Sequence, residues 1–408
     1  MNVPKLLYSL LFIAALNACN GQQPVPRISS GNKVSGGGKI VCGAERMDEV
    51  KALLQDKRVA LMVNGTSLVG TTHLVDTLLT YNINIKKIFA PEHGFRGDAD
   101  AGEHVKDSVD AKTKIKIISL YGDKKKPTNQ ELKDIDVVVF DIQDVGVRFY
   151  TFISSLHYLM EACAANDKEL IVLDRPNPNG WYVDGPVLKK EFQSFVGVDP
   201  IPVVHGLTIG EYAQMVNGEK WLQDGAQCKI KVVTCLNYTH ASRYNLPVKP
   251  SPNLPNEIAI FNYPSICYFE GTDVSVGRGT DNPFQVIGAP QITVRNFSFM
   301  PKSKPGAKNP PHLNQVCFGF DLRRVNTFKA GIDLSYLIKT YQAFSDTAKY
   351  FLPGNFFEKL AGTADLRQQI KEGKTEAEIK ATWQADLNEY KKKRKTYLLY
   401  KDFEETVR

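Results

Sequence analysis

Five short apolar runs in the first half of the chain constrain its fold more than any other feature. They lie at residues 59–63, 85–90, 115–120, 136–140 and 170–173, and turn-forming or polar residues follow each one. Such runs are typical of strands that are buried on both faces. The segments between them favour helices: Thr128 and Glu131 have capping-box spacing, and residues 150–165 carry apolar side chains at helical intervals. This alternation predicts an α/β fold with a parallel sheet covered by helices.

Polar side chains recur where these strands end. They are Asn64, Glu92, His93, Asp141, Asp144, Asp174 and Arg175. In open α/β sheets, ligands bind beyond the carboxyl ends of the strands, so we expect a site there. Turn formation or helix capping could explain Asn64 and Asp174 without a ligand. It explains Glu92 and His93 poorly, because neither is a preferred turn residue.

Several common site types have no motif in this sequence. The chain lacks a glycine-rich dinucleotide or P-loop motif, a GxSxG nucleophile elbow and an HExxH helix. Its seven histidines are scattered, so we expect neither a cofactor nor a metal. The net charge of +7 is modest for 408 residues, and no basic stripe is interleaved with aromatic residues. We therefore expect no nucleic-acid partner.

The first 39 residues predict export and anchoring. Lys5 precedes an apolar run at residues 6–16, which is shorter than the roughly 20 residues of a membrane-spanning helix but fits a signal peptide. Leu16-Asn17-Ala18-Cys19 resembles a lipobox, which makes Cys19 the expected lipid attachment site; an ordinary signal peptide with an incidental cysteine is the alternative. Residues 1–19 are thus a predicted lipoprotein signal peptide and lipobox, and residues 20–39 a flexible tether. The expected location is periplasmic, lipid-anchored to the membrane.

Six cysteines follow Cys19, and none belongs to a CxxC pair. An oxidising compartment would permit disulfides, and Cys228 and Cys235 could pair across a hairpin. Their spacing does not decide whether they do.

Five ordered motifs give the chain a family resemblance. They span residues 91–97, 141–151, 174–178, 205–211 and 269–280. In this order they resemble the exo-β-N-acetylmuramidase (NamZ) family, and the resemblance covers roughly residues 45 to 403. It implies a Rossmann-like N-terminal domain and a second, smaller α+β domain with the active site between them; we place these domains at residues 40–224 and 225–408. It also implies release of N-acetylmuramic acid from the non-reducing ends of peptidoglycan fragments.

Cleavage of a glycosidic bond usually needs a carboxylic acid to protonate the leaving oxygen and a second group at the anomeric carbon. Glu92 is the candidate general acid, although it could instead form a loop salt bridge with Arg96. Asp141, Asp144 and Glu270 compete for the second role. The sequence does not choose among them, so retention or inversion of configuration stays open.

Recognition of muramic acid needs a cation for its lactyl carboxylate. Arg148, Arg175 and Arg278 are candidates, and Arg278 lies between two glycines where backbone can approach a ligand. An arginine in such a loop could equally connect two loops. Tyr150 could stack on the sugar or be a core aromatic residue, and His205 is a further candidate. His93, Asn64, Asp144 and Asp174 complete the expected substrate-binding set.

Glu211 has a simpler explanation than substrate binding, because Thr208 and Glu211 have capping-box spacing. Two other functions remain open at this point. One is a non-catalytic peptidoglycan-binding lipoprotein on the same scaffold. The other is a metal-dependent deacetylase or amidase that would use His93, His104 and Asp141.

Overall fold

The computed structural model describes residues 38–92, 94–95, 107–324 and 329–404. The predicted signal peptide with Cys19, almost all of the predicted tether, and His93, Arg96 and His104 therefore lie outside the described residues. Residues 36–408 form one compact unit.

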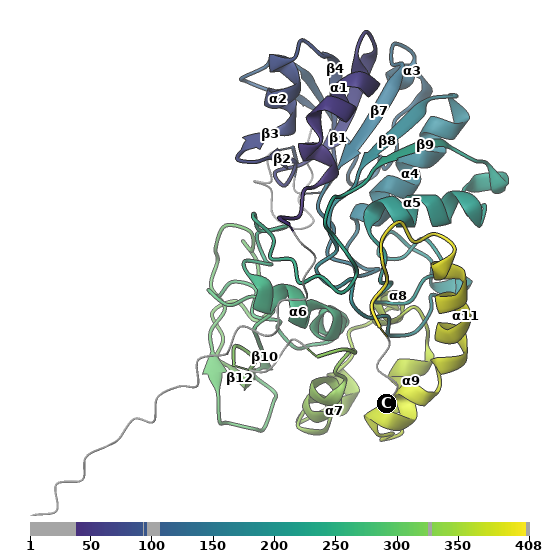
Figure 1. Cartoon of the computed structure of the whole chain (residues 1–408). Helices are drawn as coiled ribbons and strands as arrows, with labels where there is room; N and C mark the ends of the chain where they lie inside the picture. The colour runs from purple at the N-terminus through teal and green to yellow at the C-terminus, as the bar shows by residue number, and fades with distance from the viewer. Residues whose placement is uncertain (1–37, 93, 96–106, 325–328, 405–408) are drawn as a thin grey trace, which may run out of the picture. The chain divides into compact units, whose positions relative to one another are not determined.

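A seven-stranded sheet forms the first part of this unit. Figure 1 labels its strands β1, β4, β7, β8 and β9. The strand order is β5-β6-β4-β1-β7-β8-β9, and every neighbouring pair is parallel except β5 with β6. The strands are β1 (Arg58–Val63), β4 (Asn84–Ala90), β5 (Ser108–Val109), β6 (Lys116–Ser119), β7 (Val137–Asp141), β8 (Glu169–Leu173) and β9 (Lys229–Val233). Between β1 and β4, the chain also forms a two-stranded antiparallel ribbon of β2 (Leu68–Val69) and β3 (Thr72–His73). All five predicted strands are confirmed.

Helices cover both faces of the sheet, which explains why its strands are apolar throughout. Along β1, Ala60 and Met62 face one hydrophobic core, and Val59 and Leu61 face the other. The first core includes residues of α3 (Asn129–Leu132), α4 (Phe152–Ala165) and α5 (Ile209–Gly218), and the second includes those of α1 (Met47–Leu54) and α2 (Leu74–Thr80). Because side chains alternate along a strand, a strand between two cores must be apolar at every position.

The capping boxes predicted at Thr128 and Thr208 are both present, at the starts of α3 and α5. One predicted boundary needs correction. The strand β9 lies beyond residue 224, so the sheet extends further along the chain than the predicted first domain. The pairing of Cys228 and Cys235, which the sequence left open, does not occur, because both are free and lie at opposite ends of β9.

The second, smaller domain combines short helices with an antiparallel sheet of order β10-β12-β11. Its elements are α6 (Glu257–Ile266), β10 (Val286–Ala289), β11 (Ser298–Phe299), β12 (Cys317–Asp321), α7 (Ser335–Gln342), α8 (Phe356–Ala361), α9 (Asp365–Lys371), α10 (Glu376–Ala381) and α11 (Gln384–Lys395). From α11, Tyr390 donates a hydrogen bond to the carbonyl of His205, and Arg394 donates one to that of Gly206. These bonds connect the last helix to the loop that precedes α5. No helix of the described residues has the length and apolar character needed to cross a membrane.

A buried ionic group that includes His157 and Glu161 of α4 predicts a pH dependence of stability. His157 contacts Asp199 at 3.0 Å and Glu161 at 3.4 Å, and its side chain is 4% exposed. Burial alone would lower the pKa of His157, but its bonds to Asp199 and Glu161 outweigh burial and raise the pKa from 6.5 to about 9. A raised histidine pKa stabilises the fold fully below pH 6.5, and this contribution disappears as the pH rises through 9.

We therefore expect the free energy of unfolding to fall by about 3 kcal/mol between pH 6.5 and 9 through His157. Urea unfolding at a series of pH values measures it. The variant His157→Gln should be less stable at pH 6.5 and should show a flatter profile across this interval. An unchanged slope in the variant would contradict the assignment.

Candidate active site

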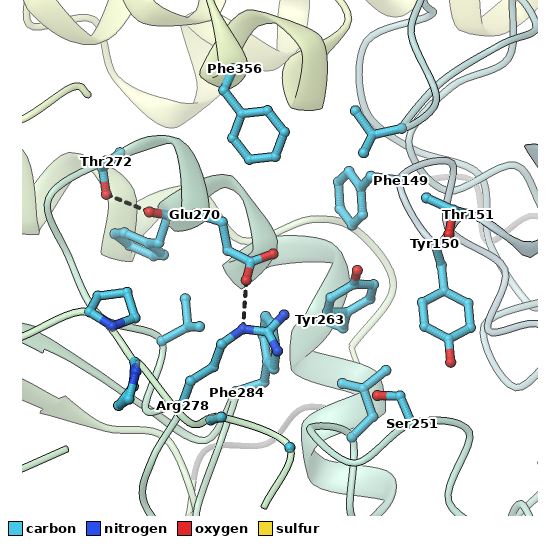
Figure 2. Close-up of a pocket in the computed structure, with 18 of the residues that line it drawn as sticks. Phe149, Tyr150, Thr151, Ser251, Tyr263, Glu270, Thr272, Arg278, Phe284 and Phe356 are labelled. Carbon is cyan, nitrogen blue, oxygen red and sulfur yellow. Dashed lines mark hydrogen bonds and ion pairs between the residues drawn. The ribbon is translucent and has the colours of Figure 1, made fainter. Parts of the chain in front are cut away.

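A cavity of about 870 Å³ lies between residues of the Rossmann-like domain and residues of the second domain. Figure 2 shows side chains from both domains around it. From the first domain the lining includes Glu92, Tyr121, Phe149, Tyr150 and Thr151. From the second it includes Tyr263, Phe269, Glu270, Asp273, Arg278, Phe284, Leu352 and Phe356. The cavity thus combines carboxylates and an arginine with many aromatic rings, a composition typical of small-molecule sites.

Glu92 reaches the cavity because it follows β4 by two residues. Tyr121, which follows the neighbouring strand β6 by two residues, donates its hydroxyl to Glu92 Oε1 at 2.9 Å. Thr151, the residue before α4, donates to Glu92 Oε2 at 2.9 Å. Burial and the adjacent Glu92 carboxylate raise the pKa of Tyr121, so its hydroxyl stays neutral and able to donate. Residues that follow β4 and β6 therefore meet at Glu92.

Glu270 and Arg278 form an ion pair within the second-domain wall of the cavity. The Nε of Arg278 donates to Glu270 Oε1 at 2.7 Å, and Figure 2 shows this contact as a dashed line. The guanidinium carbon lies 5.2 Å from the centre of the Phe284 ring. Burial would lower the pKa of Arg278, but Glu270 outweighs burial and raises it, so the guanidinium is charged.

Sequence reasoning missed Tyr121 and Asp273. The rule that led to Glu92 also applies to Tyr121, because Tyr121 directly follows the apolar run 115–120. Asp273 lies in the same motif as Glu270, lines the cavity and has His312 Nε2 3.4 Å from its Oδ1. Burial raises the pKa of Asp273.

Asp141 and Arg175 do not line the cavity. Arg175 donates to both carboxylate oxygens of Asp141, from Nε at 2.6 Å and from Nη2 at 2.9 Å. Nη2 also bonds the carbonyl of Leu68 at 3.0 Å. Asp141 is fully buried, and Arg175 is 4% exposed. The predictions of catalysis by Asp141 and substrate binding by Arg175 need correction: each charge neutralises the other inside the protein, which favours a structural role.

Arg148 also lies away from the cavity lining, fully buried. Its guanidinium donates to the carbonyls of Pro186 and Ile201 at 2.8 Å and of Leu360 at 3.0 Å. Burial lowers the pKa of Arg148 to about 10. Since Leu360 belongs to α8, Arg148 connects the two domains rather than offering a cation to a ligand.

Asp144 and His205 are buried together outside the cavity lining. Asp144 Oδ2 accepts the backbone N–H of Gly146 at 2.6 Å and lies 3.7 Å from His205 Nε2. His205 Nδ1 accepts the backbone N–H of Leu207 at 3.2 Å. These contacts shape the loop before α5, so the predicted substrate contacts of Asp144 and His205 have no support in the geometry.

Asn64 and Asp174 have structural partners as well. Asn64 Oδ1 accepts the backbone N–H of Thr66 at 2.9 Å, which is the turn-forming alternative stated above. Asp174 accepts hydrogen bonds from the backbone of Gly210, the hydroxyl of Thr208 and the hydroxyl of Tyr400. Burial raises the pKa of Asp174 to about 6. Neither residue lines the cavity.

Tyr150 lines the cavity, and its hydroxyl donates to the carbonyl of Pro250 at 2.8 Å. Among the described residues, no group of three or more His, Cys, Asp or Glu side chains could hold a metal ion. His93 and His104, which the metal-dependent alternative needs, lie outside that part of the chain.

The fold and the site define a class of protein: a two-domain α/β protein with a cavity between the domains that carboxyl groups from both domains line. Residues 59–258 match the N-terminal domain of the family described as Exo-beta-N-acetylmuramidase NamZ, and residues 261–400 match its C-terminal domain. The chain therefore belongs to this family.

Individual proteins of known sequence or structure are also similar to this chain. The chain is 37% identical over 389 residues to the peptidoglycan beta-N-acetylmuramidase NamZ of Bacillus subtilis (strain 168), covering 89% of this chain and 92% of that protein. Two crystal structures of DUF1343 family proteins from Bacteroides fragilis NCTC 9343 have the same fold. The first has a TM-score of 0.84 and 49% identity, covering 90% of this chain and 100% of that one. The second has a TM-score of 0.75 and 29% identity, covering 89% and 99%.

Proposed function

We propose that this chain is an exo-acting glycoside hydrolase that releases N-acetylmuramic acid from the non-reducing ends of peptidoglycan fragments. The observation that carries the proposal is the cavity, in which Glu92 of one domain and Glu270 and Asp273 of the other line one space. Two carboxyl groups around one bond are the usual requirement of glycoside hydrolysis. The chain shares its family with the B. subtilis muramidase across both domains.

In this reaction Glu92 is the general acid that protonates the leaving oxygen. Its hydrogen bonds with Tyr121 and Thr151 fix its orientation, so the carboxyl group meets the substrate in one geometry. Aromatic side chains that line the same cavity as Glu92, such as Tyr150 and Phe149, exclude water and offer apolar surface to the sugar. The second catalytic carboxyl group comes from the opposite domain.

The test uses a chromogenic β-N-acetylmuramide and the matching β-N-acetylglucosaminide. Release of the chromophore from the muramide and not from the glucosaminide is the expected result. A folded chain that binds peptidoglycan fragments but releases nothing from either substrate would instead indicate a non-catalytic binding protein and overturn the proposal.

We also propose that the chain is a periplasmic lipoprotein anchored through Cys19. The support is its sequence: a signal-peptide-sized apolar run, small residues before Cys19, and a polar segment after it. Acyl chains contribute about 0.8 kcal/mol per buried CH₂ group, so two or three chains anchor a protein stably.

The variant Cys19→Ser should therefore lose its lipid and its membrane association. Metabolic labelling with a fatty-acid analogue, followed by separation of the membrane fraction, measures both. Variant Cys42→Ser is the matched control and should stay labelled. Labelling that persists in Cys19→Ser would contradict the anchor.

A further inference from the structure

We propose that Arg278 selects N-acetylmuramic acid by binding the carboxylate of its lactyl group, and that Glu270 positions Arg278 instead of taking part in bond cleavage. This inference rests on the proposed function and deepens it. N-acetylmuramic acid differs from N-acetylglucosamine by a lactyl ether that carries a carboxylate. A site that discriminates between them needs a cation in a fixed place.

Arg278 is the remaining candidate of three arginines. Arg148 is enclosed by backbone carbonyls, and Arg175 is bound through both nitrogens to Asp141, so neither can reach a ligand in the cavity. Among the described residues that line the cavity, the basic side chains are Arg278 and Lys308. Lys308 is exposed and its ammonium group is a point charge, whereas Arg278 offers a planar guanidinium that matches a carboxylate through two donors.

The partners of Arg278 leave its carboxylate-binding edge open. Only Nε is bonded to Glu270, and the ring of Phe284 supports the guanidinium plane. The two terminal nitrogens have no hydrogen-bond partner among the described residues. Two parallel N–H donors at this edge match the two oxygens of a carboxylate.

The loop geometry fixes where this edge points. Gly277 and Gly279 both have φ of +79°, a left-handed conformation that other residues adopt at a cost. A Cβ at Gly277 would lie 2.6 Å from Val286 Cγ2, and one at Gly279 would lie 2.5 Å from the carbonyl of Lys302. The glycines on either side of Arg278 are therefore required by close packing, which sets the direction of the side chain.

Glu270 has the contacts of a positioning residue. Its Oε1 accepts from Arg278, and its Oε2 accepts a weak bond from the thiol of Cys267 at 3.5 Å. A carboxylate whose charge is neutralised by a bound guanidinium is a poor nucleophile and a poor base. Holding Arg278 in advance reduces the conformational entropy lost when a ligand binds. This leaves Asp273 as the carboxyl group of the second domain available for the second catalytic role.

The test compares two ligands on the full chain: N-acetylmuramic acid and its neutral lactyl methyl ester. Calorimetry should show that the unmodified chain binds the acid about 100-fold more tightly, as expected for a charge-assisted bidentate contact. In Arg278→Met this preference should fall to nearly none, and Arg278→Lys should retain part of it. The matched control is Arg295→Met, since Arg295 is exposed, lies over an aromatic ring (Phe318) and does not line the cavity.

A preference retained in folded Arg278→Met, or lost in Lys308→Met instead, would overturn the assignment of Arg278. Glu270→Gln keeps an oxygen acceptor for Arg278, so we expect kcat on the muramide to stay within about tenfold and the acid preference to persist. A loss of about 1000-fold in kcat with unchanged affinity would make Glu270 catalytic. Failure of the unmodified chain to cleave the muramide would count against the proposed function alone, because the two-ligand binding test does not depend on turnover.

Discussion

Glu92→Gln should lower kcat on a muramyl disaccharide, whose sugar leaving group is poor, by about 1000-fold, within the range of 10²–10⁴ typical of a lost general acid. The amide cannot supply the proton that the leaving oxygen needs. The amide can still form hydrogen bonds with the hydroxyls of Tyr121 and Thr151, so the position of the side chain should persist. Steady-state kinetics together with a thermal unfolding curve separates lost chemistry from lost structure.

Two comparisons make this result specific to Glu92. Tyr121→Phe removes one hydrogen bond to Glu92 and no catalytic proton, so we expect a loss of about tenfold. A substrate with a good leaving group needs little protonation and should recover part of the activity of Glu92→Gln. If Glu92→Gln kept full activity on both good and poor leaving groups, another residue would be the acid.

Sequence patterns predicted the sheet because its physical cause is local. Residues 59–63 must be apolar at every position when two cores enclose them, and this apolar run is visible in the sequence itself. The same reasoning placed Glu92 at the site, because strand order does not alter where the carboxyl ends of parallel strands lie. The turn at Asn64 is equally local, since its partner Thr66 is two residues away.

The sequence could not show which polar side chains neutralise one another. Asp141 and Arg175 are 34 residues apart and meet only because β7 and β8 are neighbours. Asp174 accepts a hydrogen bond from Tyr400, 226 residues away. Whether a strand-end residue faces the cavity or is bonded inside the protein therefore depends on tertiary contacts, which the spacing of residues in the sequence does not reveal.

The buried pair of Asp141 and Arg175 gives the second large prediction. Arg175→Met should lower the free energy of unfolding by about 3–5 kcal/mol, because it leaves the carboxylate of Asp141 buried without a counter-charge. Chemical denaturation measures this change. Adding Asp141→Asn removes the unpaired charge, so the double variant should recover part of the loss.

An exposed pair at the amino ends of β1 and β7 is the matched control. Arg58, on β1, also meets its partner Asp136 through two nitrogens, but the two side chains are 45% and 39% exposed. Water screens that pair, so Arg58→Met should cost no more than about 1 kcal/mol. Asp141→Asn should also keep most of its kcat per folded molecule. A loss of about 1000-fold there, in a variant that remains folded, would restore Asp141 to the catalytic role that its position at the strand end first suggested.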